Sequence, residues 1–316
     1  MVASKIGFLF PGQGAQYVGM GKEAADQSEK VRSIYREADQ ILGFPLSQIC
    51  FQGPEEMLTR TLYAQPAIFV TSLALLSLLE EKFPELKPEL VAGLSLGEFS
   101  ALAAAQSFSF SDGLILVKVR AEAMEKAASE KKGAMISILG LSQEECQSVA
   151  KEAGCEMANC NAPDQFVLSG NETAIDRAAG IAEAKGAQRA IRLKVSGAFH
   201  SSLMESARQR FEEAVGKITI RVPRYHFVPN VTAEEEGNPD KIRTLLAKQL
   251  THPVQWIQTI YHARDKGIQR FIEIGPGRVL KGLIKRIDPS LAVLTLEKPS
   301  DLQALESELG KGLPCC

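Results

Sequence analysis

The chain has 316 residues, of which 45% are hydrophobic and 23% charged, and its formal net charge at pH 7 is -2. This is the composition of an ordinary globular protein, and the length allows one large domain or two. Because the charge is nearly balanced, there is no basic surface of the kind that nucleic-acid binding needs, so nucleic acid is not an expected partner.

Neither the N-terminus nor the most apolar stretch predicts a membrane segment. The apolar run at residues 6–10 is broken at once by Pro11 and Gly12, so it lacks the long apolar core of a signal peptide. Residues 67–79 are the most apolar, but they include Thr71 and are fewer than the roughly 20 residues that a membrane span needs. We read them as a buried helix and expect a cytoplasmic protein without membrane contact.

Six cysteines are too few for a disulfide scaffold in a chain of this length. Cys155 and Cys160 have no second pair at metal-ligand spacing, so we expect no metal site. This cysteine usage suits a reducing compartment. Cys315 and Cys316 end the chain, where a frayed tail is expected.

The first predicted strand, residues 6–10, leads into the turn Pro-Gly-Gln-Gly-Ala-Gln. A dinucleotide fingerprint is excluded because Tyr17 stands where its third glycine is required. The turn instead predicts backbone N–H groups that face an anion or oxyanion, with Gln13 and Gln16 as nearby polar side chains.

Predicted helices at residues 21–41 and 65–82 precede a short strand at 90–92, which ends in Gly-Leu-Ser-Leu-Gly at 93–97. Gly-x-Ser-x-Gly is typical of a nucleophile elbow, a sharp turn from strand to helix that exposes the serine. A side chain at Gly93 or Gly97 would collide with the neighbouring strand or helix. Ser95 is therefore a candidate nucleophile, the alternative being a serine in a glycine-rich turn.

A further helix is predicted from Ser111-Asp112 to about residue 128, and it carries Arg120 among apolar neighbours. Arg120 is either a solvated helix charge or a buried cation. If Arg120 is buried, we expect it to have an anionic partner.

Between residues 131 and 197 the pattern becomes strand, helix, strand, strand, helix, strand, which is the split β-α-β-β-α-β arrangement of a ferredoxin-like unit. The predicted bounds are 134–139, 142–153, 156–160, 165–169, 172–185 and 190–195. We predict an α/β fold with a large, mainly parallel-sheet, hydrolase-like domain at 1–130 and 198–316. Residues 131–197 would form a small ferredoxin-like domain inserted into it.

After the insert the chain returns through a small-residue loop, Ser-Gly-Ala-Phe-His-Ser, that contains His200 and leads a helix. The later predicted elements are a strand near 225–229, helices at 240–249 and 254–266, a strand at 270–274 and a helix at 279–287.

A serine nucleophile needs a base, and the chain has four histidines: His200, His226, His252 and His262. His200 is the favoured candidate because it opens the return to the large domain in a loop of small residues. None of the aspartates between Ser95 and His200 is placed to orient a histidine. A carbonyl could do so, which predicts a dyad.

Several of these segments together resemble one family, the malonyl-CoA:acyl carrier protein transacylases, which are free-standing enzymes of dissociated fatty acid synthesis. The resemblance spans residues 5–298. It rests on Phe-Pro-Gly-Gln-Gly-Ala-Gln at 10–16, Gly-Leu-Ser-Leu-Gly-Glu at 93–98, Arg120, Gly-Ala-Phe-His-Ser at 197–201, Pro-Val-Gln-Trp at 253–256 and Glu-Ile-Gly-Pro-Gly at 273–277.

The resemblance implies a role for each matching residue. Ser95 would attack a malonyl thioester, His200 would be its base, and a carbonyl of Gln255 would orient the imidazole. The backbone N–H groups of Gln13 and Leu96 would form an oxyanion hole. By the same resemblance, Arg120 would bind the malonyl carboxylate and Phe199 would crowd the α-carbon of the acyl group.

The implied partners are malonyl-CoA and an acidic acyl carrier protein, and we expect a monomer without a cofactor. Surface cations near the cleft between the domains are candidates for carrier docking: Arg192, Lys194, Lys281, Lys285 and Arg286. One departure is Leu94, where many members have histidine. The alternative reading is a serine thioesterase or esterase on a related scaffold, which has no need for a cation facing the acyl group.

Overall fold

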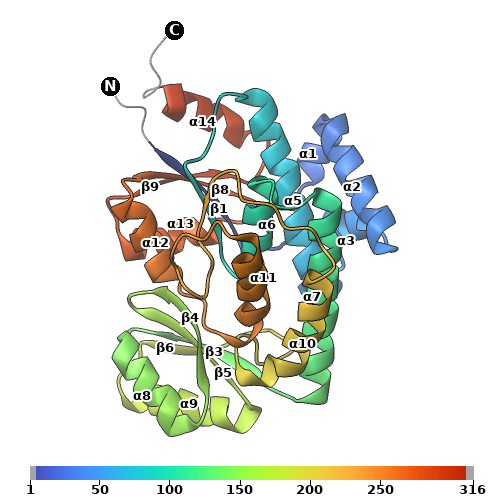
Figure 1. Cartoon of the computed structure of the whole chain (residues 1–316). Helices are drawn as coiled ribbons and strands as arrows, with labels where there is room; N and C mark the ends of the chain where they lie inside the picture. The colour runs from blue at the N-terminus through green and yellow to red at the C-terminus, as the bar shows by residue number, and fades with distance from the viewer. Residues whose placement is uncertain (1–4, 311–316) are drawn as a thin grey trace.

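The computed structural model describes residues 5–310 and contains two separate sheets, one parallel and one antiparallel (Figure 1). The Cys315–Cys316 prediction lies outside the described residues. Up to the end of the long green helix in Figure 1, the elements are β1 (Ile6–Phe10), α1 (Lys22–Gln27), α2 (Glu29–Leu42), α3 (Leu46–Gln52), α4 (Glu55–Thr59), α5 (Thr61–Lys82), β2 (Leu90–Gly93), α6 (Gly97–Ala104) and α7 (Phe110–Glu130).

The second part of the chain forms the antiparallel sheet and its two helices, seen at the foot of Figure 1. Its elements are β3 (Ala134–Leu139), α8 (Gln143–Ala153), β4 (Glu156–Ala162), β5 (Gln165–Gly170), α9 (Glu172–Ala184) and β6 (Arg189–Arg192). The strand order is β4-β5-β3-β6. β3 therefore lies between β5 and β6 and pairs with both in antiparallel fashion.

The chain then returns to the first sheet. The remaining elements are η1 (Ser202–Met204), α10 (Glu205–Val215), β7 (His226–Phe227), α11 (Pro239–Lys248), η2 (Gln249–Thr251), α12 (Trp256–Asp265), β8 (Arg270–Ile274), α13 (Val279–Ile287), β9 (Ala292–Leu296) and α14 (Asp301–Gly310).

The parallel sheet has the order β7-β2-β1-β8-β9, and each neighbouring pair runs parallel. Parallel strands end at the same edge of a sheet, and ligands bind in α/β proteins at that carboxyl edge. The turn after β1, the serine turn after β2 and the loop after β7 therefore meet there, although they are far apart in the sequence. A single bridge, Asn159 to Val254, links β4 to this part of the molecule.

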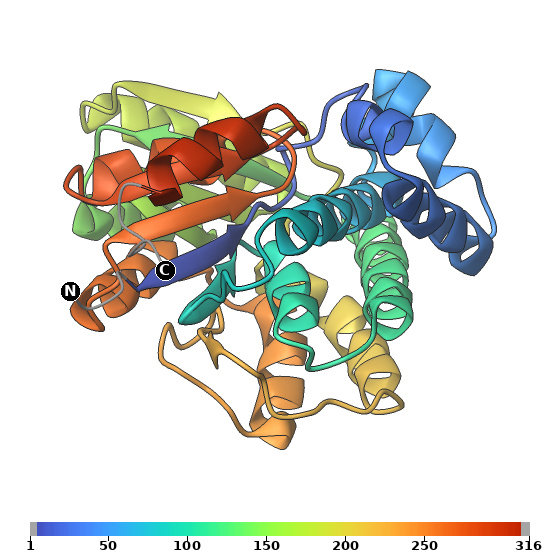
Figure 2. The same cartoon turned by 90° about the horizontal axis from the view of Figure 1, so that it is seen from above.

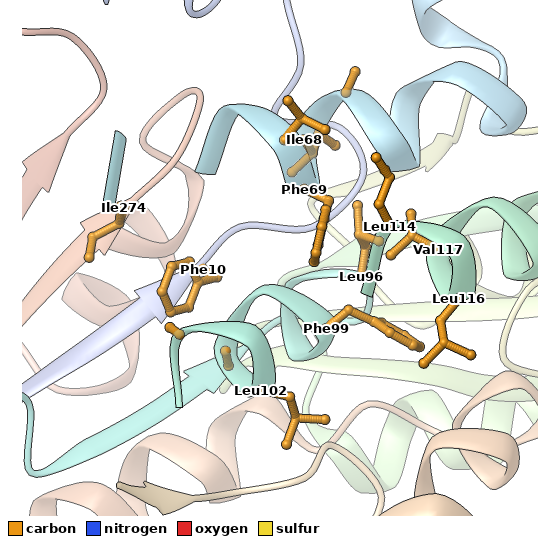
Figure 3. Close-up of a cluster of buried hydrophobic side chains, with 14 of the residues drawn as sticks. Phe10, Ile68, Phe69, Leu96, Phe99, Leu102, Leu114, Leu116, Val117 and Ile274 are labelled. Carbon is orange, nitrogen blue, oxygen red and sulfur yellow. The ribbon is translucent and has the colours of Figure 1, made fainter. Parts of the chain in front are cut away.

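Helices α5 and α7 pack side by side, as seen from above in Figure 2, and α5 also contacts β8 of the parallel sheet. α5 is long and apolar enough to cross a membrane, but 83% of its most apolar window is buried inside the fold. It is a core helix. Figure 3 shows Leu96 and Phe99, which flank the start of α6, packed among Phe69 of α5 and Leu116 of α7. The core thus anchors the segment that follows the candidate nucleophile.

Most predicted elements are confirmed, and four have the predicted bounds: β1, β3, β8 and α13. α5 begins at Thr61, four residues before the predicted start at residue 65, and Pro66 lies inside the helix. The predicted helix at 21–41 is two helices, because Ser28 ends α1 and caps α2 with its side chain. The cap of α7 is Ser109, whose Oγ accepts from the backbone N–H of Asp112. The patterns above do not predict α3, α4, β9 or α14.

Candidate active site

The serine turn after β2 is a strained elbow held from both sides. Ser95 has a φ of 50°, in the left-handed region that ordinary residues avoid. A Cβ atom on Gly93 would lie 2.0 Å from the carbonyl carbon of Gly97, and one on Gly97 would lie 2.0 Å from the carbonyl oxygen of Phe10. Only glycine fits at these two positions, as the motif predicts. Asn230 pins the turn by accepting from the Ser95 backbone N–H at 2.7 Å.

Ser95 and His200 lie in direct contact. The hydroxyl of Ser95 is 2.8 Å from Nε2 of His200, and Nδ1 of the same ring is 2.7 Å from the backbone oxygen of Gln249. A carbonyl oxygen can only accept, so Nδ1 carries the proton and Nε2 is left to accept from the serine hydroxyl. This is the arrangement of a nucleophile and its general base.

The prediction that Gln255 orients the imidazole is wrong in this structure. The Gln255 carbonyl accepts from the backbone N–H and the hydroxyl of Thr259, both at 3.0 Å, at the first turn of α12. The carbonyl that faces His200 belongs to Gln249, in the 3-10 turn after α11. A short helical turn leaves carbonyls without helical partners, which makes this one free to accept from a side chain.

Burial, followed by the positive charge of Arg120, lowers the pKa of His200 to about 4. The carbonyl of Gln249 acts in the opposite direction, because it favours the protonated ring. His200 is only 4% exposed. The imidazole is therefore neutral across the physiological range, which is the state that a general base requires.

The predicted oxyanion donors flank the nucleophile. Gln13 follows β1, Leu96 follows Ser95, and both line the same cavity. The backbone N–H groups of these two residues take part in none of the hydrogen bonds found among residues 5–310. Free N–H groups on the wall of the nucleophile's cavity suit a developing negative charge, and that of Leu96 also lies at the N-terminus of α6. The Gln16 side chain instead accepts from the backbone N–H of Gly14 at 2.7 Å.

Arg120 is a buried cation, only 1% exposed, that lies beside the nucleophile. Its Nη2 donates to the Ser95 hydroxyl at 3.1 Å and to Oε1 of Gln249 at 2.9 Å, and its Nη1 donates to Oε1 of Gln65 at 2.6 Å. All three acceptors are neutral, and Nε has no partner among the described residues. Within residues 5–310, therefore, no anionic side chain contacts Arg120 directly, contrary to the expectation of an anionic partner. Burial lowers the pKa of Arg120 to about 10, which leaves it protonated at neutral pH.

Gln249 connects the base to the cation. Its backbone oxygen accepts from His200, its side-chain oxygen accepts from Arg120, and its side-chain nitrogen donates to the carbonyl of Ser95 at 2.9 Å. The same nitrogen donates to Oε2 of Glu98 at 2.6 Å. Arg120 can only donate, and the Ser95 carbonyl and the Glu98 carboxylate accept. The side-chain oxygen of Gln249 must therefore face Arg120 and its nitrogen must face the other two, which fixes the orientation of the amide.

The site opens into a cavity of about 380 Å³ between the two sheets. Residues of the parallel-sheet part on its wall include Ser95, Arg120, His200, Phe199 and Leu94. The antiparallel sheet supplies the opposite wall through Met135, Asn159, Asn161, Val167 and the segment 193–195. Phe199 is 5% exposed and adjacent to His200 in the chain, so it narrows the space next to the reacting atoms.

Five surface cations were candidates for carrier docking, and only Lys194 lies on the wall of this cavity. Arg192 pairs with Asp176 at 2.9 Å, and Arg286 pairs with Asp164 at 2.6 Å. Among residues 5–310, no group of three or more histidine, cysteine, aspartate or glutamate side chains could hold a metal ion.

Sequence reasoning missed the residues that support the dyad, namely Gln65, Asn230 and Gln249. One signal could have found Asn230: it follows β7, and strands of one parallel sheet bring their carboxyl ends together. Nothing in the local pattern marks Gln65 or Gln249, which stand at helix positions without a motif.

The comparisons with known proteins agree with this geometry. The family model described as acyl transferase domain matches residues 7–290. A curated relative, the malonyl CoA-acyl carrier protein transacylase of Bacillus subtilis, is 40% identical over 95% of this chain and 96% of its own length.

Two solved structures are also similar to this chain. The malonyl-CoA:acyl carrier protein transacylase of Xanthomonas oryzae pv. oryzae has a TM-score of 0.93 at 38% identity, covering 98% of this chain and 99% of its own. A malonyl-transacylase in complex with its type II PKS acyl-carrier protein has a TM-score of 0.92 at 36% identity, covering 96% of this chain and all of its own, 100%.

Proposed function

Since the chain belongs to the family of malonyl-CoA:acyl carrier protein transacylases, we propose that it moves a malonyl group from malonyl-CoA to the phosphopantetheine thiol of an acyl carrier protein. It is an acyltransferase, and its product supplies extender units for fatty acid synthesis. It acts as a cytoplasmic monomer and uses no cofactor.

One observation carries this proposal: Nη2 of Arg120 lies 3.1 Å from the Ser95 hydroxyl. In a malonyl thioester the free carboxylate is separated from the reacting carbonyl by a single methylene group. A cation that binds this carboxylate must therefore lie next to the nucleophile. A plain thioesterase or esterase has no such requirement, so Arg120 favours the transferase over that alternative.

In the first half-reaction, His200 takes the proton of Ser95 as Oγ attacks the thioester carbonyl. The N–H groups of Gln13 and Leu96 stabilise the negative charge that forms on the carbonyl oxygen. His200 then gives its proton to the departing sulfur of coenzyme A, and the malonyl group remains on Ser95 as an ester. The Gln249 carbonyl keeps the imidazole in the productive tautomer throughout.

In the second half-reaction, the carrier thiol enters the cavity that coenzyme A has left. His200 takes the thiol proton, the sulfur attacks the ester carbonyl, and the proton returns to Ser95. Arg120 holds the malonyl carboxylate in both halves, and Phe199 leaves little room for a branch at the α-carbon. Lys194 at the cavity wall is the cation placed to meet an acidic carrier.

We also propose a domain organisation that serves this site. Residues 131–197 form an inserted ferredoxin-like domain, and residues 1–130 and 198–316 form a hydrolase-like catalytic domain. The element order from β3 to β6 and the strand order β4-β5-β3-β6 support the first assignment. The insert provides one wall of the acyl cavity, so its position sets how much of the substrate is shielded from water.

A transfer assay tests the function. The chain is mixed with malonyl-CoA and a holo carrier protein, and malonyl-carrier is measured by mass spectrometry. We expect transfer by the native chain, none above background by Ser95→Ala, and none to a carrier that lacks phosphopantetheine. Release of free malonate without malonyl-carrier would show that the chain is a hydrolase.

A further inference from the structure

Glu98, the residue after the second glycine of the elbow, is a carboxylic acid that the reaction described above does not use. It lies in the first turn of α6 and is only 1% exposed. Its Oε2 accepts from the backbone N–H of Asn230 at 3.1 Å and from Nε2 of Gln249 at 2.6 Å. Its Oε1 is buried and has no partner among the described residues. Burying a carboxylate with one oxygen that accepts no hydrogen bond costs free energy, so its presence here calls for an explanation.

The charge that Glu98 faces is Arg120. The two side chains are joined through the Gln249 amide, whose nitrogen donates to Glu98 and whose oxygen accepts from Arg120. Among residues 5–310, Arg120 is the charged group that acts on Glu98. α7 presents Arg120, the loop after β7 and the turn after α11 present amide groups, and His200 is held neutral by burial. In the empty site, the ionised Glu98 therefore offsets the buried guanidinium.

A substrate carboxylate changes this balance. Once it binds Arg120 directly, two carboxylates share one buried cation, and like charges in one site cannot both remain ionised without a large cost. The substrate carboxylate has the direct contact, whereas Glu98 acts only through an amide. We propose that Glu98 is the counter-charge of Arg120 in the empty site, and that it takes up one proton from solvent when the acyl carboxylate binds Arg120.

The geometry can accommodate that proton. Oε1 of Glu98 carries no hydrogen bond, so it can be protonated while Oε2 still accepts from Asn230 and Gln249. Burial raises the pKa of Glu98 to about 7, so a modest further rise is enough to neutralise it. The buried charge of the site is then zero both before and after binding.

Glu98 touches neither the acyl group nor the reacting atoms, so it is a positioning residue that acts through Arg120. This inference rests on the proposed function and adds a specificity device to it. A malonyl group brings the charge that displaces Glu98 as the counter-ion. An acetyl group has no carboxylate, so Glu98 remains the counter-charge of Arg120 when it binds.

The test measures proton uptake on binding. Ser95→Ala, which cannot be acylated, is titrated calorimetrically with malonyl-CoA at about pH 8 in two buffers of different ionisation enthalpy. We expect an uptake of roughly 0.5 to 1 proton per malonyl-CoA bound. Acetyl-CoA is the matched ligand, because it has the same coenzyme and no carboxylate, and it should give an uptake near zero.

Glu98→Gln in the Ser95→Ala background is the matched variant, because its side-chain oxygen can still accept from Asn230 and Gln249 but cannot be protonated. It should bind malonyl-CoA without proton uptake. The affinity of Ser95→Ala itself gives a second readout that needs no change at Glu98. The dissociation constant for malonyl-CoA should rise as pH increases above 7, by up to about tenfold per pH unit, while that for acetyl-CoA stays level.

Equal uptake with both ligands, no uptake with either, or uptake that persists in Glu98→Gln would overturn the proposal. The native chain is assayed in parallel for malonyl transfer to Ser95. If that assay fails, the proposed function is wrong. If it succeeds while no proton is taken up, only the role of Glu98 is wrong.

Discussion

At the carboxyl edge of the parallel sheet, His200 is 4% exposed and has one partner on each ring nitrogen, Ser95 and the carbonyl of Gln249. At the amino edge, where β7 begins, His226 and His262 lie on either side of Glu235 at 3.0 and 3.3 Å. His226 is exposed, and it lines a hollow of about 500 Å³ that contains no serine or cysteine.

The amino-edge cluster also contains a direct ion pair, because Lys266 contacts Glu235 at 3.1 Å. Yet its side chains can exchange their partners for water, so each pair contributes little. At the carboxyl edge, burial gives both ring nitrogens of His200 a fixed partner. It keeps that base neutral and leaves Arg120 without a direct anionic contact among residues 5–310. The comparison shows that a histidine next to a carboxylate is not enough to make a catalytic site. The histidine must also be buried away from water and held by an acceptor that fixes its tautomer, as the Gln249 carbonyl does for His200.

The largest expected effect comes from removing the buried base. His200→Ala should slow the acylation of Ser95 by malonyl-CoA by about 100- to 10,000-fold near neutral pH, because no other group accepts the serine proton. The rate is measured from the growth of the acyl-enzyme mass. His226→Ala is the matched control at the amino edge and should acylate at the native rate. A similar loss in both variants would remove the distinction between the two edges.

The second effect is on the choice of acyl group. Arg120→Leu should lower the ratio of malonyl to acetyl transfer by roughly 100-fold, because a buried charge pair is lost for malonyl alone. Competition between the two coenzyme A esters measures the ratio directly. Lys118→Leu, on the same helix and bonded to the Leu42 carbonyl, is the control and should keep the native ratio. An unchanged ratio in Arg120→Leu would contradict the assignment of this side chain to the substrate carboxylate.

The residues of this site that belong to a local sequence pattern could be predicted from the sequence. Gly93 and Gly97 could be predicted because a close approach requires them, and Ser95 because a strained turn exposes it. His200 could be selected from four histidines by the small residues around it. The bounds of β1 followed from a short apolar run, which is the signature of a buried parallel strand.

The contacts that could not be predicted from the sequence are made between residues that lie far apart in the chain. Which carbonyl faces His200 is decided by the turn after α11, and neither Gln249 nor Gln255 has a local feature that distinguishes it. The neutral environment of Arg120 was not foreseen because Gln65 lies far from it in the sequence. The edge strand β9 is only partly buried, so its pattern is weak.

A third effect concerns pH. Burial and Arg120 lower the pKa of His200 to about 4, so the imidazole stays neutral well below its usual range. The acetylation of the native chain by acetyl-CoA should therefore change by less than about twofold between pH 7.5 and 5.5. An ordinary histidine would give roughly a tenfold loss. Acetyl-CoA is chosen because it has no carboxylate to compete with Glu98 for Arg120, so its binding should not depend on the protonation of Glu98. A midpoint near pH 6.5 would show that His200 is solvated.

The stability of the protein should respond to the same group. The unfolded chain binds a proton at His200 near pH 6.5, whereas the folded chain does so only near pH 4. The free energy of unfolding is thus unaffected by His200 above pH 6.5 and falls as pH decreases from 6.5 toward 4. Urea unfolding of the native chain and His200→Gln over this interval measures the contribution.

The smallest effect is expected at the amino edge. Glu235→Ala removes the carboxylate that Lys266, His226 and His262 all contact, yet it should lower the free energy of unfolding by only about 1 kcal/mol and leave transfer unchanged. Urea unfolding and the transfer assay check the two parts. A large loss of activity would mean that this edge communicates with the catalytic edge.

The most direct test of the whole account is the intact mass of the native chain after brief mixing with malonyl-CoA, followed by peptide mapping. The account predicts one malonyl group per chain, on the peptide that contains Ser95, which disappears when holo carrier protein is added. A malonyl group on another residue, or one that the carrier does not remove, would contradict it.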